Sequence, residues 1–265
     1  MKTNPQDCHA LGPLSLRCQR DGPHDAETNM QVRRRIRPLI IEEKKTMKNV
    51  LIINAHQFFE GISGGKLNST LAGVIRQEMA ARGYGVKETY IEQGYDVQDE
   101  VDKHLWADII ILQSPVFWFG MPWIYKKYVD EVFTAGMFQQ RFLSGDGRTR
   151  EDPRKQYGSG GKMHGKQYML SLTWNAPRAA FGDAGQMLFE GKTVDDVFVS
   201  NTANYRFCGV EVLPSFSCFD VMKQPDVAGA IEELRGHLDA IFHSVASPLR
   251  QVEGEMDDAL TSSWR

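Results

Sequence analysis

The chain has 265 residues, with 31 lysines and arginines against 34 aspartates and glutamates, and its formal net charge is −3. Its apolar fraction of 42% is typical of a folded globular protein and argues against disordered, collagen-like and coiled-coil classes. No apolar run reaches the roughly 18 residues of a membrane-spanning helix, and the N-terminus lacks the apolar core of a signal peptide. We therefore expect a soluble protein.

The charge is divided unevenly along the chain. Residues 1–46 hold 9 basic and 6 acidic residues, a net charge of +3, which leaves 22 basic and 28 acidic residues, a net −6, in the remainder. Nucleic-acid-binding domains usually carry clustered basic residues, so the acidic body argues against a nucleic-acid partner. The cysteines Cys8, Cys18, Cys208 and Cys218 form no C-x-x-C pair. This favours free thiols in a reducing, cytoplasmic setting over a zinc site or any other metal site.

Composition and pattern predict three segments. Residues 1–46 show no hydrophobic periodicity, and an apolar run begins just after Met47. We interpret residues 1–46 as an N-terminal extension that is disordered or that arises from a start site upstream of Met47. Residues 47–246 are predicted to form one domain, and residues 247–265 a polar C-terminal tail.

Between these ends, apolar runs alternate with helical stripes. In chain order the pattern predicts a strand at 50–53, a helix at 67–79, a strand at 86–91, a weaker helix at 99–106, a strand at 109–112, a helix at 125–133, a strand at 169–172, a weaker helix at 194–206, a strand at 210–216 and a helix at 231–242. Continuous apolar runs suit parallel strands that are buried on both faces. We therefore predict an α/β fold with an open five-stranded parallel sheet and helices on both faces. Pro214 places the last strand at an edge.

The segment after the first predicted strand is a candidate ligand site, because open parallel sheets bind ligands beyond the carboxyl ends of their strands. Residues 63–70 are rich in small side chains and lead into a helix. Small residues let a ligand approach the backbone, and a helix N-terminus offers free N–H groups, which together favour a phosphate. The glycine spacing matches neither a Walker A loop nor the dinucleotide fingerprint. A capped helix start explains the segment equally well.

Two further strand ends carry candidate ligand contacts. An aromatic turn, 116–119, lies between Pro115 and Pro122, and residues 173–176 follow the strand at 169–172. Aromatic clusters usually pack in cores, but a cluster in a strand-to-helix turn can equally line a cleft. A flat ligand such as a flavin or a quinone would stack on this turn, and the polar groups of residues 173–176 could bond the edge of its heterocycle.

A long loop, 141–165, separates these two strand ends. Between Arg141 and Lys166 the chain has seven basic and three acidic residues, although the body as a whole is acidic. Loops of this length are usually functional lids or disordered segments. The charge favours a phosphate-bearing ligand, whereas a solvated loop is the simpler explanation.

Motifs for protein-borne catalysis are missing. The sequence contains no G-x-S-x-G or H-E-x-x-H motif and no paired carboxylates at a strand end. His56 alone could act as a base, but a lone histidine more often has a structural role. A bound cofactor is therefore expected to carry any demanding chemistry.

Several segments together resemble the flavodoxin-like NAD(P)H:quinone oxidoreductase family, and specifically its bacterial branch called modulator of drug activity B. The resemblance spans residues 47 to 244. It rests on the blocks 49–54 with 65–68, 105–108, 118–123 with 126–128, 144–150 with 152–153 and 157–161, and 168–177. Five blocks in the same order are much more specific than any one of them.

The resemblance implies a homodimer that binds FAD and reduces quinones by two-electron hydride transfer from NADPH or NADH, in ping-pong fashion. The cofactor-binding residues it implies are Ser63, Lys66, Leu67, Asn68, Thr70, Val116, Phe117, Trp118, Phe119, Tyr157, Thr173, Trp174, Asn175 and Ala176. It also implies that Tyr157 is catalytic, as a hydrogen-bond donor to the quinone oxygen. The first loop, 55–62, departs from better-known members in length and carries His56. The turn has Ser114 and Val116 at positions where other members vary.

Two alternatives remain open. One is an FMN-dependent azo- or nitroreductase of the same fold, and the other is a non-catalytic flavin-binding regulatory protein. Arg148 or Arg150 could meet the 2′-phosphate of NADPH, although no motif places them there.

Overall fold

A computed structural model describes residues 48–242 of the chain. The predictions for the N-terminal extension and for the tail at 247–265 lie outside the described residues, as do Cys8 and Cys18. No helix within residues 48–242 is both long and apolar enough to cross a membrane.

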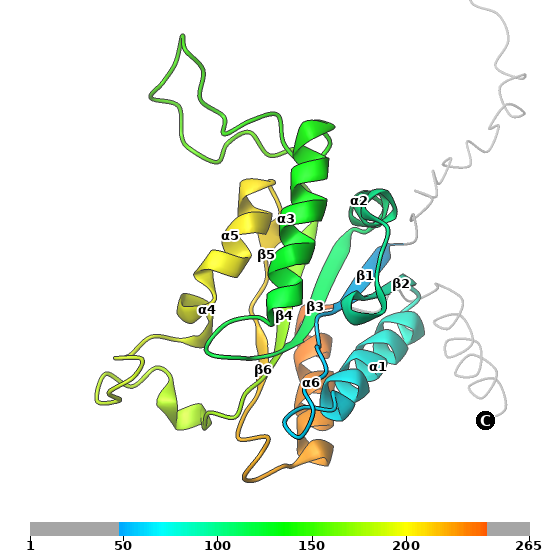
Figure 1. Cartoon of the computed structure of the whole chain (residues 1–265), viewed down its shortest axis with the longest axis vertical. Helices are drawn as coiled ribbons and strands as arrows, with labels where there is room; N and C mark the ends of the chain where they lie inside the picture. The colour runs from blue at the N-terminus through cyan, green and yellow to red at the C-terminus, as the bar shows by residue number, and fades with distance from the viewer. Residues whose placement is uncertain (1–47, 243–265) are drawn as a thin grey trace, which may run out of the picture. The chain divides into compact units, whose positions relative to one another are not determined.

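Strands and helices alternate along the described chain (Figure 1). The elements are β1 (Asn49–Asn54), α1 (Lys66–Ala81), β2 (Gly85–Tyr90), the short 3₁₀ helix η1 (Ile91–Gln93), α2 (Val97–Trp106), β3 (Ile109–Pro115), α3 (Trp123–Phe138), β4 (Gln167–Thr173), the 3₁₀ helix η2 (Arg178–Ala180), α4 (Val194–Val197), α5 (Val199–Phe207), β5 (Glu211–Val212), β6 (Phe216–Cys218) and α6 (Val227–Ile241).

All strands pair in parallel, in the order β2-β1-β3-β4-β5, with β6 also pairing with β4. The chain moves outward from β1 to β2 and then crosses to the other side of β1 to form β3. This reversal creates a switch point between β1 and β3, where open α/β sheets bind ligands. The α/β architecture predicted from the sequence is confirmed.

Helices cover both faces of the sheet and bury both sets of strand side chains. On one face α1 and α6 pack over a cluster that includes Val50, Ile52 and Ile111. On the other face α2, α3 and α5 pack over a cluster that includes Leu51 and Ile110. Both sets of side chains are essentially inaccessible to solvent, which explains why the strands read as continuous apolar runs.

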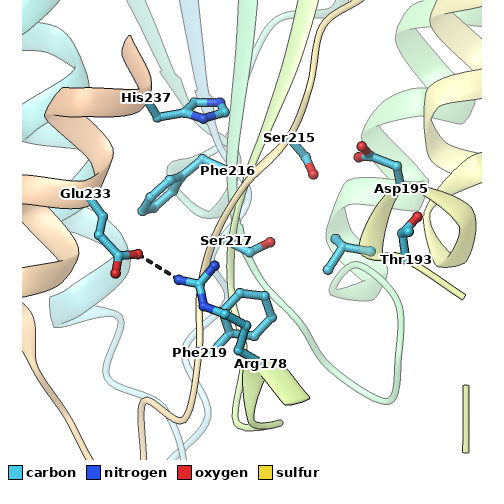
Figure 2. A pocket seen from close by; sticks show the side chains of 10 residues that line it. Arg178, Thr193, Asp195, Ser215, Phe216, Ser217, Phe219, Glu233 and His237 are labelled. Carbon is cyan, nitrogen blue, oxygen red and sulfur yellow. Dashed lines mark hydrogen bonds and ion pairs between the residues drawn. The ribbon is translucent and has the colours of Figure 1, made fainter. Parts of the chain in front are cut away.

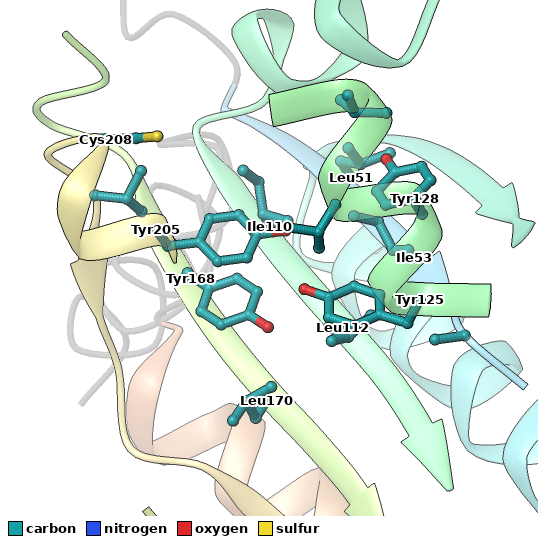
Figure 3. Packing of buried hydrophobic residues seen from close by; sticks show 14 of the residues in the cluster. Leu51, Ile53, Ile110, Leu112, Tyr125, Tyr128, Tyr168, Leu170, Tyr205 and Cys208 are labelled. Atoms are coloured by element: carbon teal, nitrogen blue, oxygen red, sulfur yellow. The ribbon is translucent and has the colours of Figure 1, made fainter. Parts of the chain in front are cut away.

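Buried tyrosines join the helices to the sheet on the second face. Figure 3 shows Tyr125 of α3 turned toward Tyr168 of β4, which lies beside Tyr205 of α5. The Tyr128 ring stacks on Tyr125 at 6.3 Å, and its hydroxyl donates to Glu100 Oε2 at 2.6 Å. The rings of Tyr168 and Tyr205 stack with centroids 3.6 Å apart. Beside them lies Cys208, whose thiol pKa is raised to about 12 by burial. Cys208 and Cys218 are both buried free thiols, as expected for the described part of the chain.

Two elements differ from the prediction. The expected strand at 210–216 is interrupted, so that β5 pairs with the start of β4 and β6 with its end, and the sheet has six strands instead of five. Pro214 lies in the gap, and proline has no N–H to donate to a sheet. The expected helix at 194–206 is also divided, at Phe198, because this residue leaves helical geometry and buries its ring against Trp174 at 5.5 Å.

The long loop predicted between 141 and 165 is an ordered arm. The Ser144 N–H donates to the Gly160 carbonyl at 2.9 Å, and the Gly158 N–H donates to the Asp146 carbonyl at 2.8 Å. A Cβ atom on Gly160 would lie 2.2 Å from the Gly145 carbonyl oxygen, so the two sides of the arm are in close backbone contact. The arm projects from the carboxyl end of α3 (Figure 1).

Candidate functional site

A cavity of about 700 Å³ lies at the carboxyl ends of β1, β3, β4 and β6. Its volume falls within the range of small-molecule and cofactor sites. The lining residues are His56, Ile62, Ser63, Gly64, Gly65, Lys66, Leu67, Asn68, Pro115, Val116, Phe117, Trp118, Phe119, Thr173, Trp174, Asn175, Ala176, Pro177, Val221, Met222 and Lys223.

The first wall of the cavity is the N-terminus of α1. Gly65 caps this helix with φ of 73°, and no side chain bonds to its free N–H groups. A Cβ atom on Gly65 would lie 2.5 Å from the His56 ring, so only glycine fits this position. The open N–H groups and the positive end of the helix dipole make this wall suited to an anion.

Asn68 holds the start of α1 against the sheet. Its Nδ2 donates to Asn54 Oδ1 at 2.7 Å, and its Oδ1 accepts from Gln113 Nε2 at 2.9 Å. Ser171 Oγ extends the chain by donating to Gln113 Oε1 at 2.6 Å, and all four side chains are buried. Asn68 therefore uses its side chain mainly inside the protein, and it can offer a ligand its backbone N–H.

The second wall is the aromatic turn. Phe117 and Gly120 exchange backbone hydrogen bonds of 2.9 and 3.0 Å, which closes a two-residue turn. Trp118 and Phe119 occupy the turn with φ of 47° and 64°, values that are costly for bulky side chains. Trp118 is 95% exposed. Backbone strain of this kind is found mainly at functional sites.

The third wall follows β4. Thr173 and Asn175 border the cavity, as predicted. Trp174 is only 2% exposed, and its ring packs against Phe181 at 4.8 Å and Phe198 at 5.5 Å. Trp174 is thus chiefly a core residue that reaches the cavity with an edge. Its indole Nε1 has no hydrogen-bond partner among the described residues.

The cavity is cationic. Lys66 and Lys223 line it, no aspartate or glutamate does, and neither lysine forms an ion pair with a described residue. Residues 47–265 carry a net charge of −6, so the cavity lining is opposite in sign to the chain around it. A ligand that combines an anionic group with a flat apolar part matches both the charge and the aromatic turn.

Two of the predicted site residues do not line the cavity. The Thr70 hydroxyl donates to the Lys66 carbonyl at 2.9 Å within the first turn of α1. Tyr157 lies on the projecting arm, where its ring contacts Phe207 at 5.2 Å and lies under Arg148. The arm follows α3 and precedes β4, so it lies at the amino ends of the strands, opposite the cavity. Within a single chain, this loop and the aromatic turn therefore lie at opposite ends of the sheet.

Several lining residues were missed by the sequence reasoning. Val221, Met222 and Lys223 follow β6, and the strand-end rule would have found them if the split of the edge strand had been foreseen. His56 and Gly65 were noticed in the sequence but not assigned to the cofactor.

A second cavity, of about 470 Å³, lies beside β6 and α6. Figure 2 shows Arg178 bridging to Glu233 in this cavity, with Asp195 on the opposite wall. Its walls carry both basic and acidic side chains, among them Arg178, Asp195 and Glu233. This mixed lining does not favour any one class of ligand.

Comparisons with known proteins agree with this fold. A family model described as flavodoxin-like fold matches residues 48–241. The chain is 42% identical over 194 residues to the NADPH:quinone oxidoreductase MdaB of Haemophilus influenzae, which covers 73% of this chain and 99% of that protein. It is also 43% identical over 195 residues to an uncharacterised protein of Schizosaccharomyces pombe, covering 74% of this chain and 97% of that protein.

Among solved structures, a protein assigned as a quinone reductase from Klebsiella pneumoniae matches with a TM-score of 0.60 at 21% identity. The match covers 74% of this chain and 86% of that chain, and at this identity it supports the fold alone. The family match and the identity to MdaB together confirm the resemblance inferred from the five sequence blocks. The chain belongs to the flavodoxin-like family, within the group of oxidoreductases that contains the NADPH:quinone oxidoreductase MdaB.

Proposed function

We propose that this protein is an FAD-dependent NAD(P)H:quinone oxidoreductase that acts as a homodimer. A flavin bound in the cavity would supply two-electron transfer between the nicotinamide and the quinone, with ping-pong kinetics. The observation that carries the proposal is the cationic cavity, in which an uncapped helix N-terminus lies beside an exposed aromatic turn.

The residues present fit a flavin. The phosphate would lie against the N-terminus of α1 and Lys66, and the ring system against the turn at Trp118 and Phe119. The Thr173 hydroxyl and the Asn175 amide would bond the polar edge of the ring system. The buried Trp174 Nε1, which has no partner among the described residues, is one further donor beside the cavity.

A small adjoining cavity supports FAD over FMN. It has a volume of about 180 Å³ and shares His56 and Gly64 with the main cavity. Phe58 and Tyr90 offer aromatic surface there, and Glu92 offers hydrogen-bond acceptors. The adenosine monophosphate group that FAD carries beyond the flavin phosphate would place its adenine in this space, whereas FMN would leave the space empty. Mass spectrometry of the flavin released from the purified protein decides between the two.

A homodimer would explain why Tyr157 lies far from the cavity of its own chain. The arm is ordered and projects from the body, and Tyr157 on it is 66% exposed. We propose that the arm reaches the partner's cavity, where the Tyr157 hydroxyl donates a hydrogen bond to the quinone oxygen. In the same arrangement, Arg148 and Arg150 on the arm would come close to the phosphate groups of the NADPH bound at the partner's cavity.

Mixed dimers test this arrangement directly. One chain would carry Tyr157→Ala with an intact cavity. The other would carry Gly64→Trp, which fills the cavity from a position where an added Cβ atom meets nothing within 4 Å, and which leaves the arm intact. If the arm acts on the partner, the mixed dimer regains about half of the wild-type activity that each parent dimer lacks. If Tyr157 acts on its own chain, mixing restores nothing.

Flavin reduction separates enzyme from non-enzyme. Addition of NADPH to the FAD-loaded protein should bleach the flavin absorbance rapidly, and addition of menadione should restore it. A non-catalytic flavin-binding protein would show neither change at a rate compatible with turnover. Equal kcat/KM with NADH and NADPH would remove the proposed role of Arg148 and Arg150 in NADPH preference.

A further inference from the structure

Apolar side chains are exposed around the mouth of the main cavity. Trp118, Phe119 and Met222 line the cavity, and Met222 is 65% exposed. The Phe119 ring meets the Phe189 ring edge-on, with centroids 5.9 Å apart. Phe189 belongs to the segment between η2 and α4, so the apolar surface continues from the aromatic turn onto this segment. Contiguous exposed apolar surface of this kind marks a binding site in many proteins.

A closed loop, 182–192, carries this surface away from the cavity. The Gly182 N–H donates to the Lys192 carbonyl at 3.0 Å, which joins the two ends of the loop. The rings of Phe181 and Phe189 stack across its base with centroids 4.4 Å apart. In Figure 1 the loop is the yellow-green segment that extends outward before α4. Its base is therefore fixed to the body of the protein, and its tip is directed away from the body.

The tip of this loop presents two apolar side chains to solvent. Met187 is 92% exposed and Leu188 is 60% exposed. The chain turns back after them through Glu190 and Gly191, which have left-handed φ angles of 51° and 85°. The Glu190 N–H donates to the Gln186 carbonyl at 3.0 Å, which closes this turn. The backbone therefore holds Met187 and Leu188 outward, where neither side chain contributes to the core.

We call the five exposed side chains around the mouth the apolar collar: Trp118, Phe119, Met187, Leu188 and Met222. The loop has two acidic residues, Asp183 and Glu190, against Lys192, and hence a net charge of −1, and residues 184–189 are uncharged. This charge does not attract the phosphate of a nucleotide or the headgroup of an anionic lipid. A second copy of the chain seated on the whole collar would close the mouth through which nicotinamide and quinone enter in turn. The collar therefore suits a neutral apolar chain attached to a ligand in the cavity.

We propose that the quinone substrate carries an apolar side chain and that the apolar collar binds this chain. The quinone ring would lie in the cavity, and its chain would leave beside Met222 and reach Met187 and Leu188 at the loop tip. Residues 187–189 span at most roughly 10 Å, a length that a chain of about two prenyl groups covers. The chain takes no part in the electron transfer, so the loop tip determines specificity without touching the reacting atoms. This proposal rests on the proposed quinone reductase function and names the substrate class of the same site.

Steady-state kinetics with a series of quinones measures this preference. Dimethoxy-methyl-benzoquinone is compared with the same ring carrying one or two prenyl groups, with NADPH as the donor. Because partial burial of its carbon atoms stabilises the bound quinone, each prenyl group should raise kcat/KM roughly tenfold. The gain should appear as a lower KM at constant kcat, since the chain is bound equally well in the ground state and in the transition state.

The double variant Met187→Ser with Leu188→Ser tests the loop tip. Both side chains are exposed, so the fold should be preserved, and an unchanged unfolding temperature verifies this. The gain from the second prenyl group should fall from roughly tenfold to about twofold, because this group reaches the tip. The gain from the first prenyl group should persist, because Phe119 and Met222 bind it.

Val199→Ser is the matched control. Val199 is 52% exposed on α5 and belongs neither to the collar nor to the lining of the main cavity. This variant loses as much exposed apolar surface as one position of the loop tip, and it should leave the kinetics of the whole quinone series unchanged.

The other outcomes each contradict the proposal. Equal kcat/KM across the series in the wild type, or an unchanged gain from the second prenyl group in the double variant, would show that the collar does not bind the chain. A double variant that elutes as a monomer where the wild type elutes as a dimer would assign the loop tip to a subunit contact. Cosedimentation of the wild type, but not of the double variant, with phosphatidylcholine vesicles would assign it to a lipid surface.

Menadione, which has no chain, separates this proposal from the proposed function. Reduction of menadione without any preference for prenylated quinones would overturn this proposal and leave the proposed function intact. Failure to reduce menadione or any quinone of the series would overturn the proposed function and this proposal with it.

Discussion

Replacing Trp118 and Phe119 by asparagine and glycine should make the apo-protein more stable and at the same time impair flavin binding. Both residues have left-handed backbone angles in a two-residue turn closed by Phe117 and Gly120. Asparagine followed by glycine is the pair that such turns favour, because these residues adopt the left-handed region at little cost.

The magnitude follows from backbone strain and exposure. A left-handed conformation costs a bulky residue roughly 1–2 kcal/mol, so the pair stores about 3 kcal/mol. Trp118 is 95% exposed and loses almost no packing on replacement, whereas Phe119 is 49% exposed and contacts Phe189 at 5.9 Å. Subtracting about 1 kcal/mol for that contact leaves a net gain of about 2 kcal/mol. For a domain of this size, the unfolding temperature should rise by about 4–8 °C.

The assay compares apo-proteins, because bound flavin would stabilise the wild type by mass action. Urea and thermal unfolding give the stability, and quenching of flavin fluorescence gives the Kd. Two lost stacking contacts should weaken flavin binding roughly ten- to a hundredfold. The control is Trp123→Gln, which removes another exposed aromatic side chain from a helical backbone that carries no strain. A destabilised double variant, or one with unchanged flavin affinity, would refute the reasoning.

Three further predictions concern the interior of the fold. Gly65→Ala should lower the unfolding temperature and weaken flavin binding, because the new Cβ would lie 2.5 Å from the His56 ring; Gly64→Ala, with nothing within 4 Å, is the matched control. Burial lowers the pKa of His104 to about 4, so the unfolded chain takes up this proton first as the pH falls. Stability should therefore drop by about 3 kcal/mol between about pH 6.5 and pH 4, and urea unfolding of His104→Gln should show a flatter profile. Gln113→Met should cost about 2–3 kcal/mol in urea unfolding, because it leaves the partners of Gln113 unpaired and buried.

The sheet and its main helices could be predicted from the sequence because buried positions produce periodic hydrophobic patterns. The spacing of Leu67, Leu71, Val74, Ile75 and Met79 predicts one face of the helix at 67–79. In α1 the last four are buried, and Leu67 at the helix start is partly buried. The edge of the sheet produces a weaker hydrophobic pattern in the sequence. The interruption around Pro214 depends on how β4 pairs at each of its ends, and pairing between distant strands cannot be deduced from local pattern.

The candidate site was predictable to the extent that it follows strand ends. Residues after the expected strands at 50–53, 109–112 and 169–172 do meet in one cavity. Contacts behind the wall were not predictable. Glu92 lies 36 residues from His56 along the chain, and only the parallel pairing of β1 with β2 brings them together.

The distance between the two ends of the sheet argues that one chain does not hold a complete site if Tyr157 takes part in the reaction. The cavity lies at the carboxyl end of β3 and the arm at the amino ends, and β3 has 7 residues. At about 3.3 Å per residue the two ends are roughly 23 Å apart, whereas a tyrosine side chain spans only about 6 Å. The Met163 N–H donates to the Cys208 carbonyl at 2.8 Å, and the Tyr157 ring contacts Phe207 at 5.2 Å, so the arm cannot bend back over that distance without breaking its contacts with the body. A role for Tyr157 in quinone reduction therefore requires a second copy of the chain, and a protein that remained fully active as a monomer would exclude that role.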